Sequence, residues 1–281
     1  MVIKKIAVVG AGTMGSGIAQ VCAQNGFDVL LFDINSSVLE KGKVSIEKNL
    51  QFLIDKQKIS AEERESISHR LTFISDINDC TADLVIEAIV EKIEAKVDVF
   101  SQLAKINSKE TIFASNTSSL SVSDIQSKIN GPQRVVGMHF FNPATLMKLV
   151  EIVKGKDTSD DVAQTVYSFC GQLKKTAVFC SDAPGFIVNR VARHYYLEAM
   201  KLVEKGIAGF ENVDEIMEAS GFKMGPFKLM DLIGMDVNLA VSQSLYDSFQ
   251  LEERFRPNQL QIDKVSKGEL GKKTGKGFYN Y

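Results

Sequence analysis

The stretch that most constrains the fold is a glycine-rich turn near the beginning of the sequence, Gly10-Ala11-Gly12-Thr13-Met14-Gly15. An apolar run at residues 6–9 precedes the turn and is typical of a strand buried on both faces. Apolar residues at helical spacing follow the turn as far as Gly26, and a second apolar run at 29–32 ends at Asp33. This order predicts a βαβ unit whose first turn is rich in glycine.

Such a unit predicts a dinucleotide-binding site. Gly10 permits the tight turn, Gly12 lets the backbone approach a pyrophosphate, and Gly15 lets the helix pack closely against the strand. The free N–H groups and the positive dipole end at the start of the helix attract phosphates. Asp33 stands where a carboxylate accepts hydrogen bonds from an adenosine ribose, and its charge repels a 2′-phosphate. The sequence therefore predicts NAD in preference to NADP.

The composition narrows the class of protein. A chain of 281 residues is long enough for two domains with separate cores, and a net charge of -2 gives no reason to expect a nucleic acid or an anionic membrane as a partner. The cysteines are Cys22, Cys80, Cys170 and Cys180. None has a CxxC partner, so we expect buried reduced thiols, no metal site and a cytoplasmic location. We also expect no leader and no transmembrane segment.

The pattern of apolar runs predicts an α/β domain followed by a helical one. Further strands are predicted at 71–74, 84–86, 111–114, 135–138, 149–153 and 177–180, and helices at 36–67, 93–106 and 159–173, with a capping box at Ser60 starting a second helix within the first of these ranges. After Pro184 no strand pattern appears, and helices are predicted at 185–205, 212–220, 226–249 and 259–267. The aromatic residues of the tail at 271–279 are expected to pack onto this helical part.

The three histidines differ in their surroundings. His69 lies in a polar stretch and is predicted at the surface, whereas His194 stands beside two tyrosines within a helix, where a packing role is expected. His139 follows the predicted strand 135–138, at the edge of the sheet where open α/β proteins bind ligands. His139 is therefore the candidate acid or base, with a structural role as the alternative.

Five motifs then carry a family resemblance. They are GAGTMGSGIAQ at 10–20, ASNTSSL at 114–120, GMHFFNP at 137–143 with MKLVEIV following, APGFIVNR at 183–190 and GKKTGKGFY at 271–279. In this order they make the chain resemble the L-3-hydroxyacyl-CoA dehydrogenases, in the short stand-alone form similar to 3-hydroxybutyryl-CoA dehydrogenase. The resemblance implies an α/β fold, with a Rossmann-type, mostly parallel sheet domain at 1–184 that binds NAD. It also implies an all-α domain at 185–281 that forms a homodimer, and an active site for acyl-CoA in the cleft between the domains.

The resemblance also implies roles for individual residues. His139 is the general base for the substrate's 3-hydroxyl, Glu151 holds its imidazole, Ser118 bonds the substrate oxygen and Asn189 supports the acyl group. The implied cofactor contacts are the turn Gly10 to Gly15, Asp33, Glu91, Lys96, Asn116, Ser118, Asn142 and Lys273. The implied coenzyme A contacts are Asn49, Lys56, Lys96 and Ser118, with Asn49 standing where relatives carry a serine.

The expected dimer contact uses the apolar helices after Pro184, with Phe227, Leu229, Met230 and Leu232 near it.

Three alternatives stay open at this point. The β-hydroxyacid dehydrogenases of the hydroxyisobutyrate type open with a similar turn, but they rely on a lysine at the start of the helical domain, and residues 185–190 contain none. A relative with the same fold could oxidise a sugar acid of the gulonate type. A non-catalytic NAD-binding protein is the third alternative, which retention of Ser118, His139, Glu151 and Asn189 disfavours.

Overall fold

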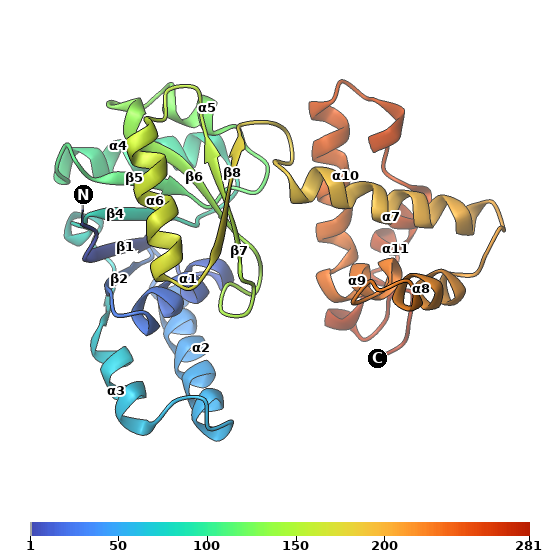
Figure 1. The fold of residues 1–281 in the computed structure, drawn as a ribbon, viewed down its shortest axis with the longest axis horizontal. Coiled ribbons are helices and arrows are strands. Elements are labelled where there is room, and N and C mark those ends of the chain that lie inside the picture. Colours follow the sequence, from blue (N-terminus) through green and yellow to red (C-terminus); the bar gives the residue numbers. More distant parts are fainter. Residues whose placement is uncertain (1) are drawn as a thin grey trace. The chain divides into compact units, whose positions relative to one another are not determined.

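The computed structural model describes residues 2–281, and the chain forms two compact units, Met1–Ala183 and Pro184–Tyr281 (Figure 1). The first unit contains the sheet and the second is built from helices, as the sequence predicts. Among residues 2–281, none of the helices combines the length and the apolar character that crossing a bilayer requires.

The first unit is organised around one sheet of eight strands in the order β3-β2-β1-β4-β5-β6-β7-β8. The strands are β1 (Lys5–Val9), β2 (Asp28–Phe32), β3 (Leu71–Ile74), β4 (Leu84–Glu87), β5 (Ile112–Ser115), β6 (Val135–Phe140), β7 (Leu149–Lys154) and β8 (Thr176–Ser181). Neighbouring strands are parallel except β6 and β7, which are antiparallel. The Rossmann-type, mostly parallel sheet predicted from the sequence is thus confirmed.

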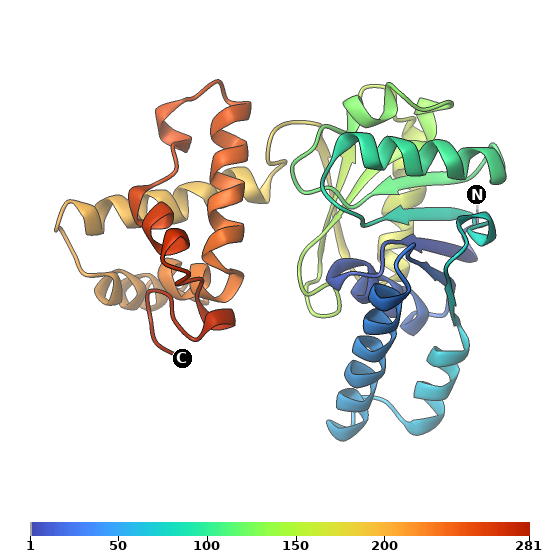
Figure 2. The same cartoon turned by 180° about the vertical axis from the view of Figure 1, so that it is seen from behind.

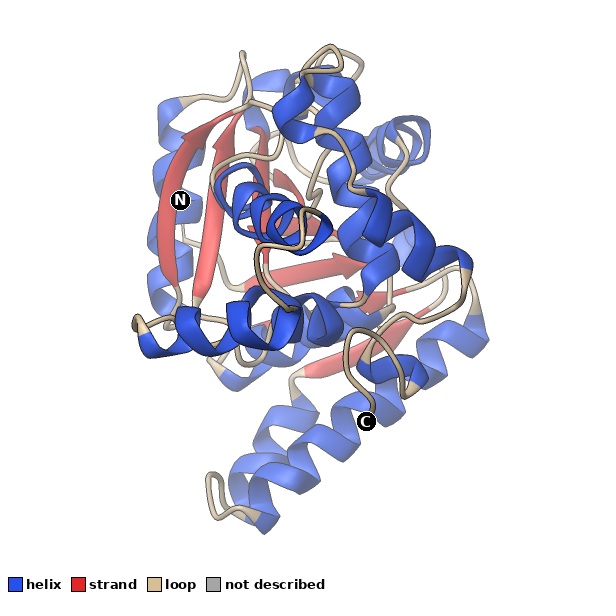
Figure 3. Ribbon diagram, turned by 90° about the vertical axis from the view of Figure 1, so that its right-hand side faces the viewer, coloured by secondary structure: helices blue, strands red, loops and turns tan. Residues whose placement is uncertain are grey.

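Helices cover both faces of this sheet (Figure 3). They are α1 (Thr13–Gln24), α2 (Ser36–Asp55), α3 (Ala61–His69), α4 (Ile93–Ile106), α5 (Val122–Gln126) and α6 (Asp160–Gln172). On one face α1 and α6 share a core with the strands, where the rings of Phe27 and Phe169 lie 5.0 Å apart. On the other face the ring centres of Phe100 of α4 and Phe113 of β5 lie 5.3 Å apart, and Figure 2, which views the molecule from behind, shows α4 lying across that face of the sheet. Strands buried on both sides explain the continuous apolar runs in the sequence.

The second unit contains α7 (Val188–Glu204), α8 (Phe210–Ala219), α9 (Pro226–Ile233), α10 (Met235–Ser248) and α11 (Gln259–Ser266). The single helix predicted at 226–249 is wrong, because Gly234 adopts a φ of 103° and separates α9 from α10. Phe227 and Met230 are fully buried in the core of this unit, so neither side chain is exposed for a subunit contact of its own. Their helix presents Leu232 instead, which is 50% exposed.

Two buried carboxylates fasten the C-terminal tail to the second unit. Asp231 accepts hydrogen bonds from the N–H groups of Phe278 and Tyr279, each at 2.9 Å. Asp214 accepts one from the Tyr279 hydroxyl at 2.8 Å and also bonds the first amides of α9. The prediction that the aromatic residues of the tail pack down is therefore confirmed.

Candidate active site

The glycine-rich turn after β1 has the shape that a dinucleotide phosphate needs. Gly10 has a φ of +100°, and a Cβ on Gly15 would stand 1.7 Å from the carbonyl oxygen of Gly10, so no side chain fits at either position. Gly12 is the N-cap of α1, and among the described residues no side chain caps the N–H groups in the first turn of this helix. A Cβ on Gly12 would meet no atom within 4 Å, so open space lies before the start of the helix. These features fit the pyrophosphate of NAD.

A cavity of about 960 Å³ opens beside this turn. It is lined mainly by apolar side chains that follow β1, β2 and β4, together with Asp33 and Asp76, and its lining includes no lysine or arginine. Asp33 Oδ2 accepts a hydrogen bond from the Ala11 N–H and Oδ1 accepts one from the Asn35 N–H, both at 2.9 Å. Each oxygen keeps a second lone pair for a ribose hydroxyl. The charge of this cavity fits NAD and disfavours a 2′-phosphate.

His139 and Glu151 meet at the antiparallel pair of strands. The register of β6 and β7 sets the two residues directly opposite each other. Their Nδ1 and Oε2 atoms lie 2.7 Å apart, and both residues are buried. Because a carboxylate accepts, Nδ1 carries the proton, which in the neutral tautomer leaves Nε2 as the basic nitrogen. The contact between Glu151 and the imidazole of His139 that the resemblance implies is thus present in the structure.

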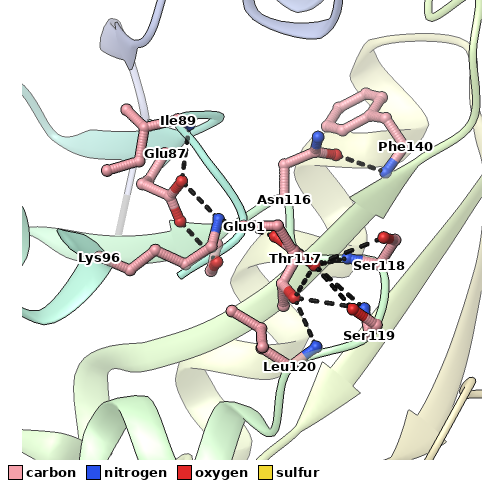
Figure 4. A network of polar contacts seen from close by, with 11 residues as sticks. Glu87, Ile89, Glu91, Lys96, Asn116, Thr117, Ser118, Ser119, Leu120 and Phe140 are labelled. Carbon is pink, nitrogen blue, oxygen red and sulfur yellow. Dashed lines mark hydrogen bonds and ion pairs between the residues drawn. The ribbon is translucent and has the colours of Figure 1, made fainter. Parts of the chain in front are cut away.

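A network of polar contacts lies at the ends of β4 and β5 (Figure 4). Asn116 Oδ1 accepts a hydrogen bond from the Phe140 N–H at 2.9 Å, which ties the end of β5 to the residue that follows His139. Glu91 Oε1 accepts from the Thr117 hydroxyl at 2.7 Å and from the Ser118 N–H at 2.9 Å. Burial opposes ionisation of Glu91, but Lys96 and these hydrogen bonds hold its pKa below the ordinary value.

Lys96 lies in the interior rather than at the surface. Its Nζ is 2.7 Å from Glu87 Oε1 and 3.1 Å from Glu91 Oε2, and its side chain is 1% exposed. Glu87 and Thr117 were not among the predicted site residues. An acidic residue at the end of an otherwise apolar strand is the signal that could have identified Glu87.

The remaining predicted residues lie elsewhere on the two units. On α2, Asn49 Nδ2 donates to Gln20 Oε1 at 3.2 Å, and Lys56 is exposed at the C-cap with its Nζ 5.6 Å from the centre of the Phe52 ring. Asn142 lies in the loop after β6. In the second unit, Asn189 lies in the first turn of α7 and Lys273 forms an ion pair with Asp236.

Comparison with known proteins agrees with this geometry. The family model of the 3-hydroxyacyl-CoA dehydrogenase NAD-binding domain matches residues 5–183, and that of the 3-hydroxyacyl-CoA dehydrogenase C-terminal domain matches residues 185–281. The chain therefore belongs to the 3-hydroxyacyl-CoA dehydrogenase family. It is an oxidoreductase whose first unit is an NAD-binding domain.

Individual relatives cover the whole chain. A probable 3-hydroxybutyryl-CoA dehydrogenase of Deinococcus radiodurans is 42% identical over 99% of this chain and 100% of its own length. The 3-hydroxyadipyl-CoA dehydrogenase of Escherichia coli is 43% identical over 99% of this chain, which spans only 59% of that longer relative. The crystal structure of (S)-3-hydroxybutyryl-CoA dehydrogenase from Ralstonia eutropha superposes with a TM-score of 0.94 at 38% identity and covers 100% of this chain and 99% of that chain.

Proposed function

We propose that this protein oxidises (S)-3-hydroxyacyl-CoA to 3-oxoacyl-CoA with NAD and catalyses the reverse reduction, with short chains such as 3-hydroxybutyryl-CoA as substrates. The observation that carries this proposal is the buried His139–Glu151 pair at the antiparallel strands of an NAD-binding sheet. The names of two full-length relatives support this choice: a probable 3-hydroxybutyryl-CoA dehydrogenase supports the substrate, and an (S)-3-hydroxybutyryl-CoA dehydrogenase supports the substrate and its stereochemistry.

In this proposal His139 moves the proton. In the oxidation, Nε2 takes the proton of the 3-hydroxyl while carbon 3 becomes a carbonyl, and NAD when bound supplies the acceptor of the hydride. Glu151 stabilises the resulting imidazolium through Nδ1 and keeps the ring in one tautomer without exchanging the proton itself. In the reduction, the imidazolium returns its proton to the developing alkoxide.

Ser118 and Asn189 are proposed to hold the substrate around this base. The Ser118 hydroxyl would bond the substrate oxygen, and its backbone is fixed by Glu91. Asn189 would support the acyl group, and Asn49 and Lys56 would meet coenzyme A from α2, where the positive charge of Lys56 suits the phosphates of that substrate.

The proposed cofactor contacts are the turn from Gly10 to Gly15 and Asp33, followed by Glu91, Lys96, Asn116, Asn142 and Lys273.

The preference for NAD over NADP is assigned to Asp33. Exchanging Asp33→Ser together with Ile34→Arg removes the charge that repels a 2′-phosphate and adds a cation, so kcat/KM for NADPH relative to NADH is expected to rise by about a hundredfold. Initial rates with both cofactors measure this ratio, and Ile34→Gln serves as a polar control without charge. Wild-type protein that uses NADPH as well as NADH would contradict the role of Asp33.

The second unit is proposed to form a homodimer. Val191, Leu232 and Val237 on α7, α9 and α10 are between 47% and 69% exposed, which is costly for large apolar side chains in water. Sedimentation at micromolar concentration is expected to give twice the mass of one chain, and Leu232→Glu with Val237→Glu is expected to lower it to the mass of a monomer. A wild-type monomer at that concentration would contradict the proposal.

The free, largely buried cysteines support a reducing compartment, and we propose that the protein is located in the cytoplasm.

The proposed function is tested by the oxidation of NADH followed at 340 nm, with acetoacetyl-CoA as substrate. Turnover is expected with acetoacetyl-CoA and NADH. With NAD⁺ in the oxidation direction, followed by the formation of NADH at 340 nm, at most a trace of turnover is expected with a gulonate-type sugar acid or with 3-hydroxyisobutyrate. Longer 3-oxoacyl-CoA substrates in the assay with NADH measure the preferred chain length. Sugar-acid turnover without acyl-CoA turnover would contradict the proposed substrate.

A further inference from the structure

A cluster of three charged side chains, of which Glu87 and Lys96 are buried and Glu91 is 35% exposed, lies beside the proposed cofactor site. The cluster consists of Glu87 at the end of β4, Glu91 four residues later and Lys96 on α4 (Figure 4). Glu87 is 0% exposed, and its Oε1 lies 2.7 Å from Lys96 Nζ, which also lies 3.1 Å from Glu91 Oε2. Two carboxylates share one ammonium, so the cluster carries a net charge of −1. The nearby Lys92 and Glu94 are exposed and of opposite sign, so solvent screens their effect.

The hydrogen bonds to Glu87 all come from donor groups. The Ile89 N–H donates to Oε1 at 2.7 Å and the Ser115 hydroxyl donates to Oε2 at 2.6 Å. All three of its partners are therefore donors, as an ionised carboxylate requires. Glu91 is also held ionised, because Lys96 and the Thr117 and Ser118 donors lower its pKa against the effect of burial. The net negative charge is thus a fixed feature of the folded protein.

The fold directs the nicotinamide end of the cofactor toward this cluster. The cavity that contains Asp33 lies at the carboxyl ends of β1 and β2, and its wall continues through Ala88 and Ile89, directly after Glu87. The glycine-rich turn follows β1, which lies between β2 and β4 in the sheet. With adenosine at Asp33 and the pyrophosphate at the start of α1, the other half of the dinucleotide extends across the ends of β4 and β5. Those ends carry Glu87 and Ser115.

We propose that Glu87 makes the site discriminate between the two oxidation states of the cofactor in favour of NAD⁺. This inference rests on the proposed cofactor site. The nicotinamide ring is positively charged in NAD⁺ and neutral in NADH, so a net charge of −1 beside it stabilises the oxidised form selectively. In a partly buried site, one unit charge changes the binding affinity of a ligand that carries a second unit charge by about tenfold when the two charges lie several ångströms apart. Glu87 acts through this field and through its hold on Lys96, without touching the reacting atoms.

The test is the ratio of the dissociation constants of NAD⁺ and NADH, measured by NADH fluorescence and by calorimetric titration with NAD⁺. Glu87→Gln keeps the shape of the side chain and makes the cluster neutral, so the Kd of NAD⁺ is expected to rise about tenfold and that of NADH less than about twofold. Ser115→Ala is the matched control, because it removes a hydrogen bond to Glu87 without changing the charge. In Ser115→Ala the ratio of the two dissociation constants is expected to equal that of the wild type.

A second variant changes the charge of the cluster in the opposite direction, so the proposal can be tested even if Glu87→Gln does not fold. Lys96→Met removes the positive charge of the cluster, so the ratio of the Kd of NADH to the Kd of NAD⁺ is expected to rise further. Unchanged ratios in Glu87→Gln and Lys96→Met, or equal weakening of both cofactors, would overturn the inference while leaving the proposed function intact. A wild-type protein that does not reduce acetoacetyl-CoA with NADH would instead overturn the proposed function.

Discussion

Replacing His139 by glutamine is expected to lower the turnover of acetoacetyl-CoA by roughly 10²–10⁴-fold, the range that a positioned acid or base contributes. Glutamine fills the space of the imidazole but can neither give nor take the proton. The affinity for NADH is expected to change less than about threefold, because neither residue of the His139–Glu151 pair belongs to the proposed NAD contacts. Turnover and NADH fluorescence titration measure the two effects separately.

Glu151→Gln is expected to lower turnover nearly as much, by about 10²–10³-fold, because the neutral amide no longer stabilises the imidazolium at Nδ1. Its melting temperature is expected to stay near that of the wild type. Asp214→Asn provides a matched control, since Asp214 is also a fully buried carboxylate but holds α9 and Tyr279 in the second unit. This control is expected to lose stability and to keep its turnover. A Glu151→Gln variant that loses stability but not turnover would show that Glu151 is structural.

The second large effect is expected at the glycine-rich turn, where Gly12 and Gly15 should respond differently to the same change. Gly12→Ala adds a Cβ that meets no protein atom, at a residue with an ordinary φ of -65°, so the fold is expected to tolerate it. The added methyl group fills the space before the start of α1, and the affinity for NADH is expected to fall by at least about tenfold.

Gly15→Ala adds a Cβ that would stand 1.7 Å from the Gly10 carbonyl oxygen, so the backbone itself has to move. We expect a loss of about 2–4 kcal/mol in the free energy of unfolding, as for overpacking in a core, together with loss of NADH binding. Thermal melting and NADH titration of both variants separate the two effects. Normal NADH affinity in Gly12→Ala would contradict the assignment of the pyrophosphate to this turn.

Much of the first unit could be predicted from the sequence, because its central strands β1, β4, β5 and β6 are buried on both faces and form unbroken apolar runs. The pairing of His139 with Glu151 was predictable for a related reason. His139 follows one apolar run and Glu151 interrupts the next. The loop after Pro143 is short enough for β7 to return beside β6. The helices of the second unit were harder to predict from the sequence. The residues of α9 and α10 form one continuous helical pattern, and only the backbone conformation of Gly234 separates the two helices.

The polar network around Glu87 was predicted only in part. Glu91, Lys96, Asn116 and Ser118 were expected at the site, whereas Glu87, Ser115 and Thr117 were missed for a different physical reason. The members of the network come from the ends of β4 and β5 and from α4, and their spacing in the sequence follows no motif. Whether a buried acid is paired depends on which side chains the fold brings to it, which a single sequence does not reveal. The same reason explains why Phe227 and Met230 were expected near a subunit contact, since the apolar residues of a helix form the same pattern whether they face a core or a partner.

The proposed mechanism requires that His139 and Glu151 perform one task. The direct measurement is the turnover of acetoacetyl-CoA by the wild type, His139→Gln, Glu151→Gln and the double variant, at one pH and with saturating NADH. Because Glu151 acts only through the imidazole, the double variant is expected to be no more than about threefold worse than the worse single variant. Losses that multiply in the double variant would mean that the two residues act independently and would contradict the proposed mechanism.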